Sequence, residues 1–303
     1  AAMTNKQSHD DGTLSEEEKK WLIRRSDGDF AIVTTAATNV TETGRGWNGE
    51  MGVWSYHHLP GLTDLANRLR KPNMITLAQL FHGGMRAPQS INGVQPVSAS
   101  VNTEPGMDGV YTRSLSHNEI LEMIESFSDA ALRCQKAGFD GVELHGAHSY
   151  LICQFLGSIT NRRDDEWGGL AIEERTKFSE EIVKKARKAV GNDYPIIFRF
   201  SQWKQQDFGH KMAKNQNELG LFLNNLSLPK NKSRFQAFNS FNGEHSSSVF
   251  KSVSIPFEGC KDDFLVYNTH IGSSCSSNVG TVSYTHLRAH ETEADLVCRL
   301  LLE

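Results

Sequence analysis

The sequence lacks the features that mark several large classes of protein. No apolar run approaches the roughly 20 residues needed to span a bilayer, and the first residues lack the charged and apolar regions of a signal peptide. These two absences predict a cytoplasmic protein that does not engage a membrane. Lysine and arginine number 32 against 36 aspartates and glutamates, with no basic block, so nucleic acid is not an expected partner.

Cysteine is scarce and irregularly spaced. The five cysteines are Cys134, Cys153, Cys260, Cys275 and Cys298, and no two of them have CxxC spacing. An odd, scattered set argues against a disulfide framework and against a structural zinc or iron–sulfur site. We therefore expect free thiols and no bound metal.

Short apolar runs alternate with amphipathic stretches from residue 1 to about residue 226. Nearly continuous apolar runs at residues 30–37, 74–81, 138–146 and 194–201 are the expected strands. Such runs are typical of parallel strands that are buried on both faces, because helices cover them or because a barrel closes on itself. The alternation predicts repeated βα units and an α/β fold.

Helix start and stop signals separate these strands. Ser15 with Glu18, and Ser116 with Glu119, have capping-box spacing. The helix that Ser116 opens ends at Gly138, and its apolar stripe consists of Ile120, Met123, Ile124, Phe127, Ala131 and Cys134. Further helices are expected over residues 172–189, before Gly191, and over residues 204–226.

The pattern changes abruptly after Leu226. Residues 227–283 are rich in serine and contain isolated phenylalanines, without a sustained period of 2 or 3.6 residues. The last 22 residues resemble a tail found on unrelated translated sequences, and a shifted reading frame or a misassembled gene would produce such a change. We predict a domain over residues 1–226 and assign no function to a tail over residues 227–303.

Polar groups lie where the predicted strands end. They are Ala2-Met3-Thr4, Thr35-Ala36, Gln79, the run from His145 to Tyr150, and Arg199. In an α/β barrel these ends converge on one mouth, where the working groups sit. Two neutral imidazoles, His145 and His148, would donate to one carbonyl oxygen while Tyr150, still protonated at neutral pH, protonates a developing enolate.

Each of these assignments has a structural alternative. The HxxH pair could bind a metal, but no third ligand lies in register with it. Tyr150 taken alone could be a packed aromatic residue, and Arg199 could form a structural ion pair. The charge run from Arg162 to Glu166 is interpreted as a structural loop network.

The run GFDGVELHGAHSYLICQFLGSITNRRDDEWGG (residues 138–169) resembles the signature of the old yellow enzyme family of FMN-dependent NAD(P)H:flavin oxidoreductases. AAMT at the start, AQLFHGGMR (residues 78–86) and FRFS (residues 198–201) are similar to that family's flavin-contacting strand ends, in the same order. The resemblance covers about residues 1–226. It implies a (β/α)8 TIM barrel, incomplete here, since about five βα units are recognisable and the first strand lacks its lead-in.

The resemblance also implies roles for single residues. Ala2, Met3 and Thr4 would contact the flavin ring, Ala36 would offer its backbone, Gln79 would bind the pyrimidine edge, and Arg199 would lie beside N1 and O2. His145 and His148 match the pair that grips the substrate carbonyl, and Tyr150 matches the proton donor. The cofactor would be FMN, reduced by NADPH or NADH in a ping-pong cycle, and the substrate would be a small enone.

The sequence shows no counterpart of the family's phosphate-binding elements. Glycine-rich loops and an arginine follow the last two strands in that family, but no apolar strand precedes Gly272, Gly280 or Arg288 here. The alternative is therefore a non-functional truncated or misassembled fragment of such an enzyme, and a more distant one is a metal-dependent TIM-barrel hydrolase. The sequence leaves open the substrate, the choice between NADH and NADPH, and whether the protein is a homo-oligomer.

Overall fold

The computed structural model describes residues 2, 4–28, 30–103, 111–201, 203–204 and 207–226, and four further strands between residues 236 and 298. Met3 and the segment with Gly272, Gly280 and Arg288 lie outside the described residues. The helices are α1 (Glu16–Ser26), α2 (Leu59–Leu69), α3 (Gln89–Asn92), α4 (His117–Ala137), α5 (Leu151–Leu156), α6 (Ile172–Val190) and α7 (Gln216–Leu226), with short 3-10 turns η1 (Glu42–Gly44), η2 (Tyr56–His58) and η3 (Gly84–Arg86).

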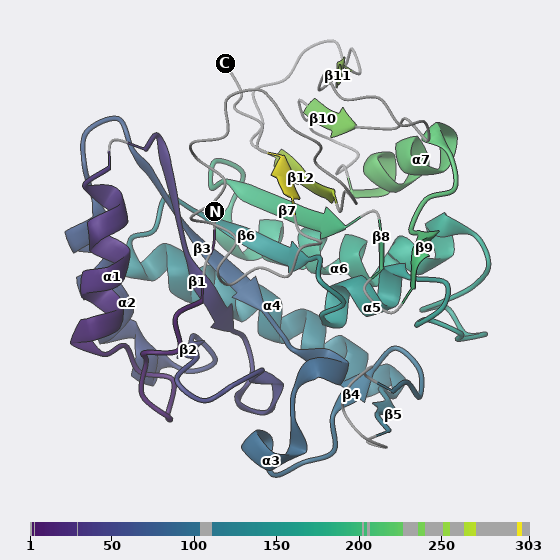
Figure 1. Ribbon diagram of the computed structural model, residues 1–303, viewed down its shortest axis with the longest axis horizontal. Helices are drawn as coiled ribbons and strands as arrows, with labels where there is room; N and C mark the ends of the chain where they lie inside the picture. The colour runs from purple at the N-terminus through teal and green to yellow at the C-terminus, as the bar shows by residue number, and fades with distance from the viewer. Residues whose placement is uncertain are drawn as a thin grey trace, which may run out of the picture.

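A central parallel sheet organises the molecule (Figure 1). Its strands, in spatial order, are β13 (Leu296–Cys298), β12 (Phe264–His270), β7 (Ile196–Ser201), β6 (Gly141–Gly146), β3 (Ile75–Phe81), β1 (Ile32–Asn39) and β2 (Met51–Gly52). Only the β12–β13 pair is antiparallel. The four predicted strands are thus confirmed within two or three residues, and β1, β3, β6 and β7 lie side by side in their chain order, as in a βα barrel.

Small two-stranded sheets flank this one. They pair β4 (Val97–Ser98) with β5 (Arg113–Ser114), β8 (Trp203–Lys204) with β9 (Asp207–Lys211), and β10 (Gln236–Asn239) with β11 (Lys251–Ser254).

Two expectations about secondary structure are wrong. The helix expected over residues 204–226 begins only at Gln216, after the β8–β9 hairpin. Asp207 and Gly209 both have low helix propensity, and Asn215 accepts from the Glu218 backbone N–H at 3.0 Å as the cap of the shorter helix. The strand end expected at Ala2-Met3-Thr4, ahead of the four confirmed strands, is also absent from the described residues there, because Ala2 and residues 4–7 belong to no strand.

The capping signals are confirmed at α4 and only half confirmed at α1. Ser116 and Glu119 form the reciprocal box, and Gly138 ends α4 with a φ of 96°, a left-handed conformation that favours glycine. Ser15 accepts from the Glu18 backbone N–H, but the Glu18 carboxylate accepts from the backbone N–H of Gln7 instead of returning to Ser15. This bond ties the N-terminal segment to α1.

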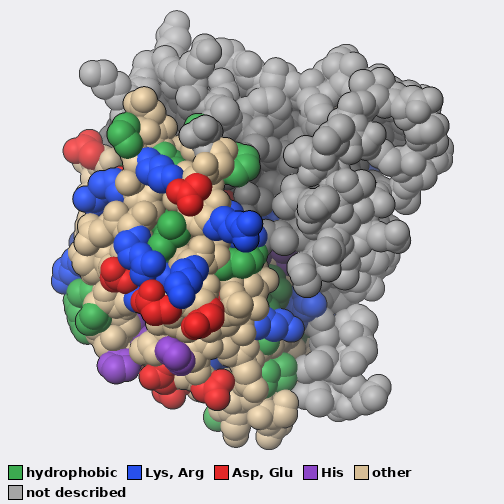
Figure 2. All heavy atoms as spheres, turned by 60° about the vertical axis from the view of Figure 1, so that its left-hand side comes forward, with side chains coloured by type: hydrophobic (Ala, Val, Ile, Leu, Met, Phe, Trp, Pro, Cys, Tyr) green, Lys and Arg blue, Asp and Glu red, His purple; other side chains and the backbone are tan. Residues whose placement is uncertain are grey.

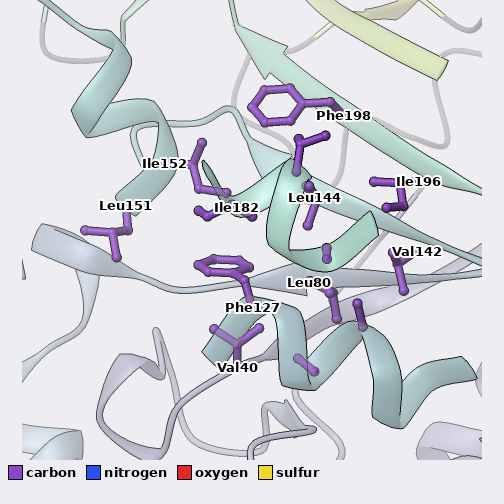
Figure 3. Packing of buried hydrophobic residues seen from close by; sticks show 14 of the residues in the cluster. Val40, Leu80, Phe127, Val142, Leu144, Leu151, Ile152, Ile182, Ile196 and Phe198 are labelled. Carbon is purple, nitrogen blue, oxygen red and sulfur yellow. The ribbon is translucent and has the colours of Figure 1, made fainter. Parts of the chain in front are cut away.

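The core lies between the sheet and the helices that cover its outer face (Figure 3). Alternate strand residues point towards these helices, and they include Leu80, Val142, Leu144, Ile196 and Phe198. They pack against Phe127 of α4 and Ile182 of α6, both fully buried. The other half of each strand, facing the barrel interior, carries Gln79 on β3, Glu143 and His145 on β6, and Arg199 on β7, which places polar groups inside.

The surface over α1 and α2 carries mixed charge. Figure 2 shows basic and acidic side chains intermingled on this side of the molecule. Lys19 pairs with Glu16 and Asp64, and Arg68 pairs with the same two carboxylates. This surface therefore has no single-sign field that would attract a polyanion. Among the described helices, none is long and apolar enough to cross a membrane.

Glu18 makes the stability of the protein depend on pH. Glu18 is 1 % exposed, and burial raises the pKa of its carboxyl from 4.5 to about 7. The folded state therefore holds this proton more tightly than the unfolded state, and stability is lost as the pH rises from about 4.5 through 7. We expect Glu18→Gln to stabilise the protein by up to about 3 kcal/mol at pH 8 and by little at pH 4, as measured by urea unfolding.

The exposed neighbour Glu17 is the matched control for this substitution. Glu17→Gln should change the unfolding midpoint equally little at both pH values. A stabilisation by Glu18→Gln that does not vary with pH would contradict the buried-proton explanation.

Candidate active site

The site residues meet because the strands are in register. The Cα of Gln79 on β3 lies opposite that of Glu143 on β6, and His145, two residues further along β6, lies opposite Arg199 on β7. Residues two apart on a strand point to the same face, so all four side chains face the barrel interior. All four are at most 4 % exposed.

Gln79 is held by two contacts. Its side-chain Nε2 donates to Glu143 Oε1 at 2.5 Å, and its backbone N–H donates to Thr35 Oγ1 at 3.1 Å. Ala37 lies directly opposite Gln79, whereas Ala36 lies in a bulge of β1, where its carbonyl accepts from the hydroxyls of Thr35 and Thr38. The Ala36 carbonyl is thus already hydrogen-bonded within β1, and Ala37 is the residue paired with Gln79 across the strands.

His145, His148 and Tyr150 form a compact aromatic group. The ring centroids of His145 and His148 are 5.0 Å apart, and that of Tyr150 lies 5.1 Å from His145 and 6.2 Å from His148. Phe81 closes the group, with its ring 4.4 Å from that of Tyr150. The three residues that the sequence predicted to act together therefore lie within reach of one small molecule.

Both imidazoles are neutral at physiological pH. Burial, and after it the charge of Arg199, lowers the pKa of each ring well below its ordinary value of 6.5. The Ala147 backbone N–H donates to His145 Nδ1 at 3.4 Å, and Arg199 Nη2, which can only donate, contacts His148 Nε2 at 3.4 Å. His145 therefore carries its proton on Nε2 and His148 carries its own on Nδ1.

A strained turn presents His148. His148 and Ser149 are consecutive residues with φ values of 55° and 58°, in the left-handed region that non-glycine residues rarely adopt. The His148 N–H donates to Ser201 Oγ at 3.2 Å, and the Tyr150 N–H donates to the Ala147 carbonyl at 3.2 Å. Contacts from β7 and within the turn thus hold a conformation that its own residues do not favour.

Two residues that the sequence did not single out lock this turn to the loop after β3. Gln154 Nε2 donates to the Ser149 carbonyl at 2.6 Å, while Gln154 Oε1 accepts from the Met85 N–H at 3.2 Å. Arg86 Nη1 donates to the His148 carbonyl at 3.0 Å, and its guanidinium lies 5.1 Å from the centre of the Tyr150 ring. The only local signal for Gln154 is a polar residue in the otherwise apolar run LICQFL.

Ser149 offers a direct test of the strain. Ser149→Gly should raise the free energy of unfolding by about 0.5–1 kcal/mol. A serine in the left-handed conformation costs about 1–2 kcal/mol, which glycine does not incur, but glycine also makes the unfolded chain more flexible and so offsets part of the gain. Thermal unfolding measures the change. Ser55, with a φ of −140°, is the matched control, and Ser55→Gly should give no gain.

The remaining predicted residues have fewer contacts. Ala2 and Thr4 are half-buried, and no described hydrogen bond joins either of them to the strand-end group. The charge run forms the expected loop network, since Arg163 pairs with Asp165 and donates to the carbonyls of Ala99 and Leu115. In the described part of the chain, no group of three His, Cys, Asp or Glu side chains is arranged to hold a metal ion, so the HxxH pair gains no third ligand there.

Residues 1–235 match the NADH:flavin oxidoreductase / NADH oxidase family. The chain belongs to this family. The chain is 36 % identical over 189 residues to a probable NADH-dependent flavin oxidoreductase, YqiG, of Bacillus subtilis, an alignment that covers 62 % of this chain and 50 % of the relative. The chain spans about half the length of the curated relatives it matches.

Solved structures of family members give the same architecture. The old yellow enzyme homologue from Zymomonas mobilis aligns with a TM-score of 0.61 at 28 % identity, over 66 % of this chain and 58 % of that one. Morphinone reductase in complex with tetrahydroNAD aligns with a TM-score of 0.63 at 26 % identity, over 72 % of this chain and 63 % of that one. The predicted TIM-barrel class is thus confirmed, and the open sheet described here is part of such a barrel.

The interior residues fit FMN, the flavin of this family. Arg199 is 2 % exposed, and its Nε has no hydrogen-bond partner within the described residues. Gln79 Nε2 donates to Glu143, and no described residue donates to Gln79 Oε1. The Gln79 side chain therefore offers an acceptor, Oε1, next to its donor Nε2. The pyrimidine edge of a flavin carries both carbonyl oxygens and an N–H, which this donor and acceptor set complements.

Proposed function

We propose that this protein is an FMN-dependent oxidoreductase that takes hydride from NADPH or NADH and reduces the activated C=C bond of α,β-unsaturated carbonyl compounds. The observation that carries the proposal is the convergence of two neutral imidazoles and the Tyr150 phenol beside the buried Arg199. The named activity of the Bacillus subtilis relative and the tetrahydroNAD complex of morphinone reductase support the nicotinamide reductant.

Gln79 and Arg199 would hold the pyrimidine edge of the flavin, with Ala2, Met3, Thr4 and Ala36 as the further predicted contacts. Bound FMN would supply a two-electron carrier that accepts hydride from the nicotinamide and delivers it to the β carbon of the substrate. The Arg199 guanidinium would stabilise negative charge on the reduced ring.

The chain's own residues would bind the substrate and move one proton. His145 Nε2 and His148 Nδ1 would both donate to the carbonyl oxygen, which stabilises the negative charge that develops there. The Tyr150 hydroxyl would give its proton to the α carbon. Hydride and proton together account for the two hydrogens added across the C=C bond.

The test is to purify the full chain, reconstitute it with FMN and add NADPH under anaerobic conditions. A yellow protein whose flavin absorbance bleaches, and then returns on addition of cyclohexenone, supports the proposal. A colourless, aggregating product would refute it and favour the truncated or misassembled fragment. Resequencing the gene across the codons for residues 226–283 tests our division of the chain into a domain and a tail.

A further inference from the structure

Unpartnered polar atoms gather at the carboxyl end of β1 and in the loop that follows it. Within the described residues, no hydrogen-bond partner exists for both amide atoms of Asn39, Thr41 Oγ1, Trp47 Nε1 or Glu50 Oε1. Asn39 is 0 % exposed and Glu50 is 1 % exposed. Because buried polar atoms are nearly always paired, this concentration of exceptions in one segment calls for a partner that the described residues do not supply.

The sheet register turns the side chains of Asn39 and Glu50 towards the barrel interior. Asn39 lies opposite Phe81 on one side and opposite Gly52 on the other. Met51 lies opposite Thr38, so Glu50, one residue earlier, shares the face of Asn39. This is the face on which the Phe81 ring contacts Tyr150.

Glu50 and Trp47 lie beside the same Phe81 ring. Glu50 Oε2 accepts from the Gly46 N–H at 2.7 Å, which holds this oxygen and leaves Oε1 without a partner. A Cβ built on Gly46 would lie 3.5 Å from Phe81 Cζ and 3.9 Å from Glu50 Oε2, and the Trp47 and Phe81 ring centroids are 5.5 Å apart. Phe81 thus links this polar group to the predicted proton donor Tyr150.

The charge state of the group indicates what it would bind. Burial raises the pKa of the Glu50 carboxyl well above its ordinary value of 4.5, which favours the protonated, uncharged form of this side chain. The group then offers the donors Asn39 Nδ2, Trp47 Nε1 and the Glu50 hydroxyl, together with the acceptor Asn39 Oδ1. A buried set of neutral donors and acceptors favours a neutral hydrogen-bonding occupant over an ion.

We propose that Asn39, Trp47 and Glu50 form a polar subsite beside Phe81 that binds a neutral hydroxyl or carboxamide carried by the unsaturated carbonyl substrate. The inference rests on the proposed function and narrows its substrate class to enones with such a substituent. The substrate's carbonyl lies between the two histidines, and its polar substituent lies on the β1 side of Phe81.

The test measures kcat/KM of the FMN-loaded enzyme for an aliphatic octenone and for its terminal-alcohol counterpart. The readout is the ratio of the value for the alcohol to the value for the octenone. The wild type should prefer the alcohol about tenfold, the effect of one additional good hydrogen bond. Asn39→Leu should bring this ratio to about one, while Glu50→Gln, which keeps a neutral polar group, should retain most of it. A ratio of one in the wild type, as expected if the subsite holds only water, or an unchanged ratio in Asn39→Leu, would overturn the proposal.

A stability measurement separates a subsite from a structural role. Asn39→Leu should leave the thermal midpoint unchanged or raise it, because no described residue loses a hydrogen bond. Asn161, 2 % exposed, is the matched control, since its Nδ2 donates to the carbonyls of Phe155 and Trp167 and Asn161→Leu should lower the midpoint. An equal fall in both variants would show that the Asn39 amide is structural. If the wild type reduces neither ketone, the proposed function itself fails.

Discussion

Tyr150→Phe should slow reduction of an enone by about 10²–10⁴-fold, the usual contribution of a positioned general acid. The phenylalanine ring keeps the packing against Phe81, whose ring centroid lies 4.4 Å away, and removes only the hydroxyl. Bleaching of the flavin by NADPH should proceed at nearly the wild-type rate, because that half-reaction transfers no proton through Tyr150. Anaerobic stopped-flow spectroscopy measures the two half-reactions separately.

Tyr194 provides the control for this substitution. It is 8 % exposed, and its hydroxyl has no partner among the described residues, so Tyr194→Phe makes the same chemical change away from the site. This variant should keep both rates. Equal losses of the two half-reactions in Tyr150→Phe would argue against the role of Tyr150 as an acid.

His145→Leu should lower kcat/KM for the same enone by about 10²–10³-fold, the cost of removing one donor to a developing oxyanion. The imidazole acts as a neutral donor, because burial and Arg199 hold its pKa well below 6.5. His145→Asn, which restores an N–H donor, should recover part of the loss. Steady-state kinetics over pH 6–8 measure both variants, and the wild-type rate should show no histidine titration in that range.

A histidine on the surface controls for the general effect of losing an imidazole. The His57 side chain is 70 % exposed, and His57→Leu should leave enone reduction unchanged. If His145→Leu also kept its activity, other groups would bind the substrate carbonyl. That result would contradict the proposed role of His145 and His148 as donors to the carbonyl oxygen.

The sequence predicted the local elements well. The nearly continuous apolar runs that became β3, β6 and β7 and the apolar stripe of α4 each lie within one element, and the burial of that element alone accounts for them. The helix expected from residue 204 was wrong at its start, because the β8–β9 strand pair occupies residues 203–211 and the helix begins only after the Asn215 cap. The predicted grouping of His145, His148 and Tyr150 followed from their closeness in the chain.

The supporting contacts could not be predicted in this way. Glu143 holds Gln79 from 64 residues away, and Gln154 reaches Met85 across 69 residues. Such bonds depend on how neighbouring strands are aligned, and no local pattern encodes that alignment. Glu143 is the partial exception, since its position two residues before His145 on a strand already placed it on the same face.

The bonds of Gln154 and Arg86 have a consequence for motion. They join the turn at His148 to the loop after β3, and the Leu151 N–H adds a third connection by donating to the His82 carbonyl at 3.0 Å. Two segments that are connected in this way open together or not at all, as one cooperative unit. Amide hydrogens at both ends of the connection should therefore exchange with solvent at one common rate, and the residues proposed to bind substrate should move as a single body.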